Sequence, residues 1–185
     1  LEAMDEDMIR DLHSKMLTSD EKTINMFDVG GQGVFSGLHM VFLTRQGVYI
    51  VCFSMEWLEG AEATPESRAY CLRGLREWLG SIVVHTADAS SDQKCAPIVL
   101  VGTHMDAVHR HAHHGAISQL LETELEQTTA GPFIVRNKKG HDANGDATLF
   151  FFPVDNTKGH NDPCAQALMQ AVEEQIDLAP YTHRL

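Results

Sequence analysis

The sequence predicts an α/β fold, in which a mostly parallel sheet is covered by helices on both faces. Two observations support this prediction. Short apolar runs of strand length alternate with longer segments whose apolar residues recur every three or four positions. Parallel strands need crossover helices between them, and this alternation supplies those helices. With 185 residues and a hydrophobic fraction of 43%, the chain has enough apolar surface for one compact core.

Four segments have the composition of strands. The clearest is at residues 47–55, where a continuous run of apolar side chains is typical of a strand covered on both faces. A similar length and an apolar face mark the other three. The predicted strands comprise residues 22–27, 47–55, 97–102 and 148–154.

Four further segments have helical periodicity, which is strongest over residues 65–84. Thr64 is a candidate N-cap for this helix, and Pro65 suits the first helical position. Asp162 is expected to cap the last helix. The predicted helices comprise residues 34–43, 65–84, 116–127 and 163–178.

Two polar segments interrupt this alternation. Residues 86–94 are rich in turn-forming side chains and predict a loop. Residues 137–146 are charged and contain two glycines, which predicts an exposed hairpin or insertion.

Charge and cysteine content narrow the class of protein. The formal net charge of −12 makes nonspecific attraction to nucleic acid or anionic lipid unfavourable, although a local phosphate site remains compatible with it. No segment approaches the roughly 20 apolar residues that span a bilayer. The four cysteines form no CxxC pair, so we expect reduced thiols in a cytoplasmic protein.

Distinctive polar loops follow three of the predicted strands, at residues 28–32, 103–106 and 155–159. Ligands of open α/β sheets collect at the carboxyl ends of the strands. Because the strands are predicted to be parallel, we expect the three loops at one edge of the sheet. A combined site is a stronger prediction than any one loop would give.

The first loop, Asp28-Val29-Gly30-Gly31-Gln32, resembles the DxxGQ element of Ras-like GTPases and of heterotrimeric G-protein α-subunits. The resemblance implies that Asp28 holds Mg²⁺ through a water molecule and that the amide of Gly31 contacts the γ-phosphate. It further implies that Gln32 orients the attacking water and is the catalytic residue. A glycine-rich turn without a ligand is the alternative interpretation.

The second loop, Thr103-His104-Met105-Asp106, stands where those GTPases carry NKxD, and its form resembles Roc (Ras of complex proteins) domains. The resemblance implies that Asp106 binds guanine, with Thr103 and His104 beside the base. The lysine that usually covers the base is absent, so we expect weaker affinity. A strand end that caps the next helix through Asp106 is the alternative.

The third loop contains Asn156 and Thr157 in the place of the weakly defined fifth motif, whose backbone amide contacts guanine. A turn without a ligand role remains an open alternative. The sequences of residues 38–44 and 75–79 also resemble segments of Roc domains. The resemblance extends from residue 22 to about residue 178.

The resemblance implies a Ras-like three-layer G domain at residues 22–185, preceded at residues 1–21 by a residual helix or switch-region segment. It implies GTP and GDP as ligands and Mg²⁺ as cofactor. It also implies a place in a multidomain signalling protein with a COR-like dimerising domain.

The phosphate-binding motif GxxxxGK[ST] is absent from the sequence, as is the first strand that precedes it. We expect a truncated chain with weak or no GTPase activity, from a parent protein that is a GTPase. Direct pairing of the strands at residues 22–27 and 47–55 in a smaller sheet is the alternative. A degenerate, nucleotide-free G domain that serves as an interaction scaffold is the other functional hypothesis.

A run of histidines follows the second loop, at His109, His111, His113 and His114. A metal site is one interpretation, and a solvated loop is the commoner one for such a run. Either way, imidazole makes the charge of this segment sensitive to pH.

Overall fold

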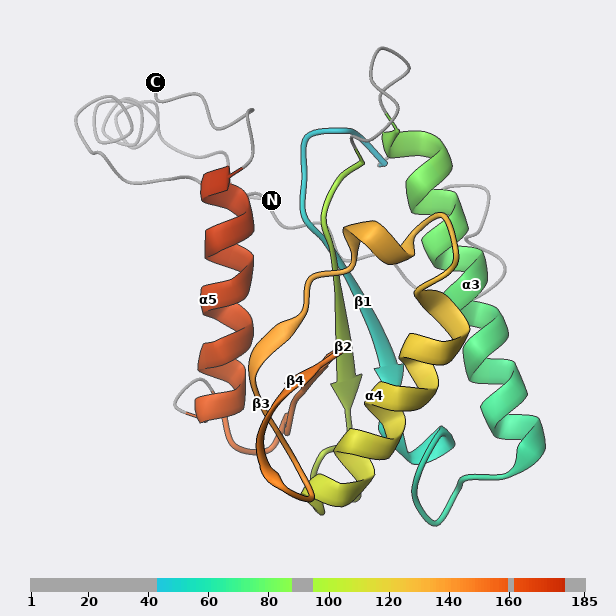
Figure 1. Ribbon diagram of the computed structural model, residues 1–185, viewed down its shortest axis with the longest axis vertical. Helices are drawn as coiled ribbons and strands as arrows, with labels where there is room; N and C mark the ends of the chain where they lie inside the picture. The colour runs from blue at the N-terminus through green and yellow to red at the C-terminus, as the bar shows by residue number, and fades with distance from the viewer. Residues whose placement is uncertain (1–42, 88–94, 160–161, 179–185) are drawn as a thin grey trace, which may run out of the picture.

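A computed structural model describes residues 43–87, 95–159 and 162–178 (Figure 1). The predicted strand at residues 22–27 and the loop at residues 28–32 lie outside these ranges. The predicted helix at residues 34–43 does as well, except for Leu43.

The main sheet is parallel, as predicted, with the strand order β1-β2-β5. Strand β1 (Tyr49–Ser54) pairs with β2 (Ile98–Thr103) along its whole length, from Tyr49 opposite Ile98 to Ser54 opposite Thr103. On the other side of β2, the short strand β5 (Phe152–Pro153) pairs through Phe152 opposite Val101. The central position of β2 explains its uninterrupted apolar sequence, because both of its faces are buried.

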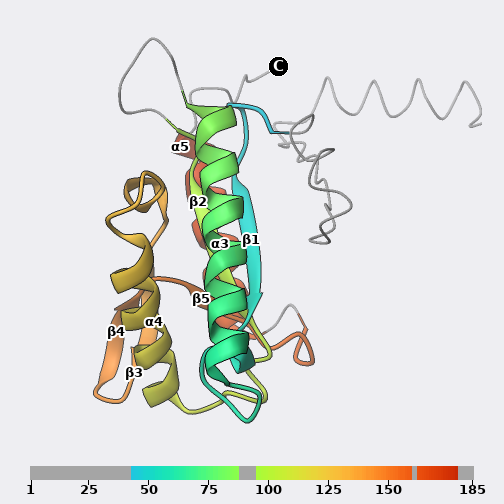
Figure 2. The same cartoon turned by 90° about the vertical axis from the view of Figure 1, so that its right-hand side faces the viewer.

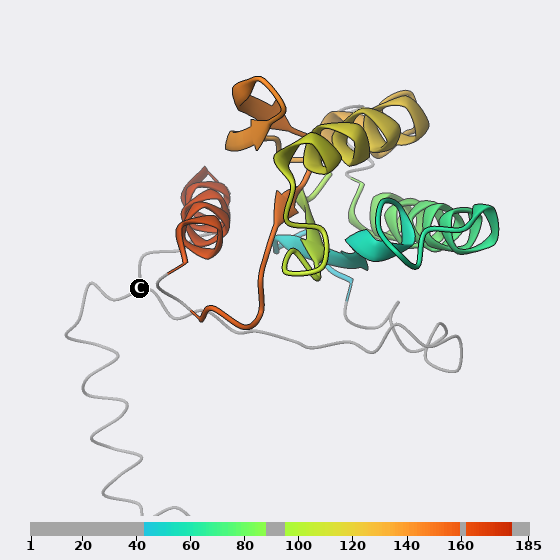
Figure 3. The same cartoon turned by 90° about the horizontal axis from the view of Figure 1, so that it is seen from below.

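Helices cover both faces of this sheet (Figure 3). Helices α3 (Pro65–Thr86) and α4 (His111–Leu125) lie on one face, and α5 (Pro163–Leu178) lies on the other. The core has two parts accordingly. The larger cluster includes Ile98 and Leu100 with the apolar sides of α3 and α4, and the smaller one joins residues of β2 and β5 to α5: Val99, Val101, Phe152, Leu168, Ala171 and Val172.

Local signals explain where the helices begin. Thr64 accepts a hydrogen bond from the amide of Ser67, the Ser67 hydroxyl accepts one from the amide of Thr64, and Pro65 begins α3. Asp162 accepts from the amides of Cys164 and Ala165 at the start of α5. Both predicted caps are confirmed. Among the described residues, 3₁₀ turns follow β1 and α4, as η2 (Met55–Trp57) and η3 (Gly131–Phe133).

An antiparallel hairpin forms the second, smaller sheet, which confirms the hairpin predicted for residues 137–146. It consists of β3 (Asn137–Asp142) and β4 (Gly145–Leu149) and lies beside α4 (Figure 2). Gly115 allows this close approach, because a Cβ there would lie 3.0 Å from the Cβ of Asp142.

The prediction of a single strand over residues 148–154 was wrong. Leu149 pairs with Asn137 in the hairpin, whereas Phe152 pairs with Val101 in the main sheet. In between, the amide of Phe150 donates to the Ser118 hydroxyl of α4 at 2.8 Å rather than to a strand. The segment therefore changes partners within three residues, which an apolar run does not reveal.

Helix α4 begins at His111, five residues before the predicted start at residue 116. The first turns contain histidines and a glycine, which give no apolar periodicity, so the pattern became visible only from Ile117. The interpretation of the histidine run as a solvated loop was therefore wrong for His111, His113 and His114, which lie in α4.

The four cysteines differ in burial: Cys52 is exposed, Cys71 is buried, and Cys95 and Cys164 are intermediate. All four are present as thiols, and burial raises the pKa of Cys71 to about 11. None of the helices in the described part of the chain combines the length and apolar character needed to cross a bilayer.

Candidate functional site

Two of the three predicted loops lie side by side at the carboxyl edge of the sheet. The amide of Val154 donates to the carbonyl of Gly102 at 2.8 Å, and the carbonyl of Val154 accepts from the amide of Met105 at 3.3 Å. One residue therefore bridges the ends of β2 and β5. This arrangement brings the 103–106 loop and the 155–159 loop together, as the sequence predicted.

Thr103 ends β2 and ties the 103–106 loop to β1. Its hydroxyl donates to the carbonyl of Phe53 at 3.1 Å and lies 3.0 Å from Nδ1 of His104. Because a hydroxyl has only one hydrogen to donate, the second contact requires a proton on Nδ1 of His104.

His104 is an exposed residue with a backbone φ of 62°, a conformation that non-glycine residues seldom adopt. Its Nδ1 also lies 3.3 Å from the hydroxyl of Ser54 at the end of β1. Ser54 was not predicted as part of the site. No sequence signal marks it, because its proximity arises from the pairing of β1 with β2.

Asp106 is exposed at the surface of the 103–106 loop, whereas Met105 beside it is buried. Its carboxylate has no hydrogen bond or ion pair with any other residue in the described ranges 43–87, 95–159 and 162–178. The turn is held by backbone bonds from the amides of Ala107 and Val108 to the carbonyl of His104. The carboxylate is therefore positioned by the backbone and left open to a ligand.

The 155–159 loop is organised by a residue that the prediction passed over. Asp155 is only 4% exposed, and one of its oxygens accepts from the hydroxyl of Thr157 at 2.6 Å and from the amide of Thr157 at 2.9 Å. These two bonds, together with Lys158 Nζ at 3.3 Å, hold the pKa of Asp155 below its usual value. An acidic residue two positions before threonine is the sequence signal for this turn.

The two predicted ligands of this loop therefore differ. Thr157 gives both its hydroxyl and its amide to Asp155, so it supports the turn. Asn156 is exposed and makes no hydrogen bond within the described part of the chain. Of the two, Asn156 is the residue left open to a ligand.

The remaining predicted site residues, Asp28, Gly31 and Gln32, lie outside the described residues. Whether the 28–32 loop joins the same edge therefore stays a prediction, and so do the metal role of Asp28 and the catalytic role of Gln32.

The histidine run forms no metal centre. Among the residues that the structure describes, no group of three or more histidine, cysteine or acidic side chains is arranged to hold an ion. The ring of His114 is 3% exposed and its Nε2 donates to the carbonyl of Val108 at 2.7 Å, while Nδ1 of His113 lies 3.3 Å from Glu59. These nitrogens are occupied by protein partners.

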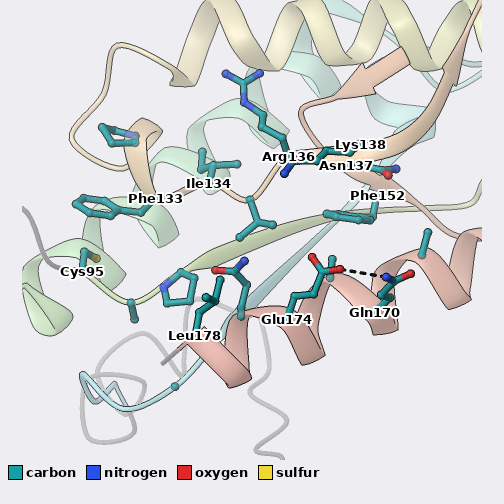
Figure 4. Close-up of a pocket in the computed structure, with 18 of the residues that line it drawn as sticks. Cys95, Phe133, Ile134, Arg136, Asn137, Lys138, Phe152, Gln170, Glu174 and Leu178 are labelled. Atoms are coloured by element: carbon teal, nitrogen blue, oxygen red, sulfur yellow. Dashed lines mark hydrogen bonds between the residues drawn. The ribbon is translucent and has the colours of Figure 1, made fainter. Parts of the chain in front are cut away.

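A groove of about 810 Å³ lies away from these loops, between α5 and the segment that leads from η3 into β3 (Figure 4). It is open to solvent at the amino end of the strands, since Gly47 and Pro97, which precede β1 and β2, both line it. Ile134 and Phe152 contribute to its apolar wall, and Gln170 donates to Glu174 on its α5 side. The groove is thus separate from the candidate site.

Comparison with known proteins gives one partial similarity. The chain is 35% identical over 88 residues to a protein of Dictyostelium discoideum named "Probable serine/threonine-protein kinase pats1". The match covers 48% of this chain and 2% of that protein. No protein-family model and no solved structure matches the chain.

Proposed function

We propose that this chain is a guanine-nucleotide-binding domain of the Roc type, which takes GTP and GDP with Mg²⁺. The single observation that carries the proposal is the union of the 103–106 loop and the 155–159 loop through Val154. These are the two loops that the resemblance assigns to guanine, and they meet although 49 positions separate Asp106 from Asp155 in the printed numbering.

In this proposal, Asp106 accepts hydrogen bonds from N1–H and from the exocyclic amine of guanine. Its exposed and unpaired carboxylate suits that role, since an acceptor already engaged in the protein would have to break a bond first. Asn156 approaches the same base from the neighbouring loop. Thr103 and His104 support the conformation of the 103–106 loop, because their side chains contact each other.

The phosphate end of the nucleotide is assigned to residues outside the described ranges. Asp28 would hold Mg²⁺ through water, Gly31 would contact the γ-phosphate, and Gln32 would orient the attacking water. Mg²⁺ would supply charge neutralisation of the phosphate oxygens. These three roles rest only on the resemblance of residues 28–32 to the DxxGQ element.

The wider context is also part of the proposal. We place the domain in a cytoplasmic, multidomain signalling protein that carries a COR-like neighbour and can dimerise. The similarity to a short segment, 2%, of a much longer protein supports such a setting. The competing function, a nucleotide-free scaffold, would use the same fold without a ligand at the carboxyl edge.

Titration of the chain with fluorescent GDP and GTP, with Mg²⁺ and with chelator, tests the proposal. We expect saturable binding that Asp106→Asn weakens by about tenfold to a hundredfold, because an unpaired buried donor costs about 1–3 kcal/mol. The same variant should bind xanthine nucleotides better than the parent chain does, since the amide NH₂ of asparagine can donate to the second carbonyl of xanthine.

Glu173→Gln serves as the control, because it neutralises an exposed carboxylate on α5, away from the carboxyl edge. It should leave the affinity for either base unchanged. A folded chain that binds neither nucleotide would favour the scaffold. An Asp106→Asn variant that retains its preference for guanine would instead contradict the role assigned to Asp106.

A further inference from the structure

We propose that the groove beside α5 binds a small amphipathic carboxylate, a single acidic group on an unbranched apolar tail. The acidic group would lie at Asn137 and Lys139, and the tail would run along α5 toward Leu178. No residue of the 103–106 loop or the 155–159 loop lines this groove, so the proposal does not depend on nucleotide binding.

A buried hydrogen-bond donor in the groove lacks a partner. Asn137, the first residue of β3, is 4% exposed and lines the groove close to Phe152 (Figure 4). Its Oδ1 accepts from the amide of Lys139 at 3.0 Å, which determines the orientation of the side chain, because the reversed amide would set two donors against each other. Its Nδ2 makes no hydrogen bond to any residue in the ranges 43–87, 95–159 and 162–178. Buried donors are nearly always paired, so this one requires an acceptor that the described residues do not supply.

Lys139 brings a positive charge to the same end of the groove. Its Nζ donates to Oε1 of Gln170 on α5, and two of the three ammonium hydrogens remain after that bond. No carboxylate pairs with Lys139 in the described part of the chain. The other end of the Gln170 amide, Nε2, donates to Glu174 at 3.1 Å (Figure 4), so the glutamine separates the lysine from this acidic residue. A carboxylate oxygen can therefore accept from both Nδ2 of Asn137 and Nζ of Lys139.

The charge along the groove is opposite in sign to that of the whole chain. Four basic residues and one acidic residue, Glu174, line it, whereas the chain contains 14 basic and 26 acidic residues. Arg136 is one of the four, and its charge is compensated by Glu122 and Glu126. The other three are Arg45, Lys138 and Lys139. The local field therefore attracts one anionic group, while the net charge of −12 disfavours a strongly acidic partner.

The remainder of the groove is apolar and elongated. Ile134, Val135 and Phe152 line one side, and Ala167 and Ala171 contribute the α5 side. No residue of α5 is fully buried, so the helix leaves apolar surface uncovered here. Between Gln170 and Leu178 the helix advances about 12 Å, at about 1.5 Å per residue, which suits an extended tail better than a compact ring. Contact with these walls would remove the tail from water.

A small molecule suits this groove better than a peptide strand does. Its volume of about 810 Å³ lies within the range of about 300–1,000 Å³ that is usual for small-ligand sites. In the described part of the main sheet, β5 is an edge strand. The amide of Val154 points toward β2, so the preceding residue, Pro153, faces the open edge and has no N–H to donate. A peptide that paired with this edge would lose a hydrogen bond there.

Titration of the isotopically labelled 185-residue chain with sodium octanoate, followed by two-dimensional NMR, tests the proposal. We expect saturable shifts of the side-chain NH₂ signals of Asn137 and of the backbone amides at residues 134–139 and 167–178. Octanoate should bind about tenfold more tightly than butanoate, because its longer tail removes more apolar surface from water. It should also bind about tenfold more tightly than octan-1-ol, which has the same tail without the charge.

Lys139→Gln separates charge from apolar contact, because it removes the ammonium and retains a hydrogen-bond donor on an exposed side chain. It should weaken octanoate binding about fivefold to tenfold and leave octan-1-ol binding unchanged. Arg73→Gln is the matched control, since it removes the same charge from the exposed side of α3, outside the groove. Its affinity for both compounds should equal that of the parent chain.

Three results would overturn the proposal. Asn137 signals that do not respond to octanoate would show that its amide has no role in binding a carboxylate. Equal affinities for octanoate and octan-1-ol would show a groove that selects only apolar surface. A nuclear Overhauser contact from the Asn137 NH₂ to residues 1–42 or 179–185 in the ligand-free sample would identify the chain itself as the occupant.

Discussion

Polar side chains in two regions of the structure differ in how many protein partners they have. At the carboxyl edge, Asp106 and Asn156 are exposed and have no partner among the described residues. Beside α4, Arg136 is fully engaged, with Glu122 and Glu126 each at 2.7 Å and the ring of Phe150 at 4.2 Å. The hydrogen-bonding capacity of the first region is unused within the described residues, whereas the second region uses it to join elements of the fold.

Phe151 is buried and follows Phe150, the residue whose ring Arg136 contacts. It lies against Gly102, where a Cβ would come within 2.7 Å of the ring, and it makes an edge contact with Phe53 at 5.5 Å. Phe151→Ala should destabilise the domain by about 3–5 kcal/mol, because a large aromatic side chain leaves a cavity. Urea unfolding measures this, with Tyr70→Ala, an exposed aromatic, as the control. A loss below about 1 kcal/mol would show that the site can collapse.

Substitution of Arg136, in the region beside α4, should have a moderate effect on stability. Arg136→Ala removes two ion pairs and one cation–π contact, and we expect a loss of about 1–2 kcal/mol in the free energy of unfolding. Arg73→Ala is the control, since Arg73 is exposed and lies 5.6 Å from the ring of Tyr70. If both variants lose equal stability, the ion pairs of Arg136 contribute nothing and the contrast between the regions weakens.

Substitution of Asp106, at the carboxyl edge of the sheet, should have the smallest effect on stability. Asp106→Ala is expected to change the free energy of unfolding by less than about 0.5 kcal/mol, because the exposed carboxylate makes no hydrogen bond or ion pair in the described part of the chain. The same urea titration measures it beside Arg136→Ala. A loss of more than about 1 kcal/mol would mean that Asp106 supports the fold, which would undermine its assignment to a ligand.

Sequence reasoning succeeded where one residue decides the local structure. Thr64 with Pro65 and Asp162 determine where α3 and α5 begin, because each acts on the helix that directly follows it. The parallel sheet followed from the alternation of short and long apolar patterns. The partition of residues 148–154 between two sheets did not, since Phe150 donates to Ser118, 32 positions away in the sequence.

The candidate site, like the fold, could be predicted from the sequence only in part. The strand ends placed the 103–106 and 155–159 loops correctly, because parallel strands share an edge. The contact of His104 with Ser54 depends on tertiary proximity that residue types alone do not give. The bonds from Thr157 to Asp155 are local, and an acidic residue two positions before a threonine could have indicated them. The roles of Asp28, Gly31 and Gln32 stay predictions.

The bridge made by Val154 affects the entropy of binding. Its amide bonds to Gly102 in β2 and its carbonyl bonds to Met105 in the 103–106 loop, so neither loop can move far without displacing the other. A ligand that contacts one loop therefore does not have to immobilise the second, whose freedom was already given up when the chain folded. The two loops would then count as one rigid body in the thermodynamics of any ligand that binds there.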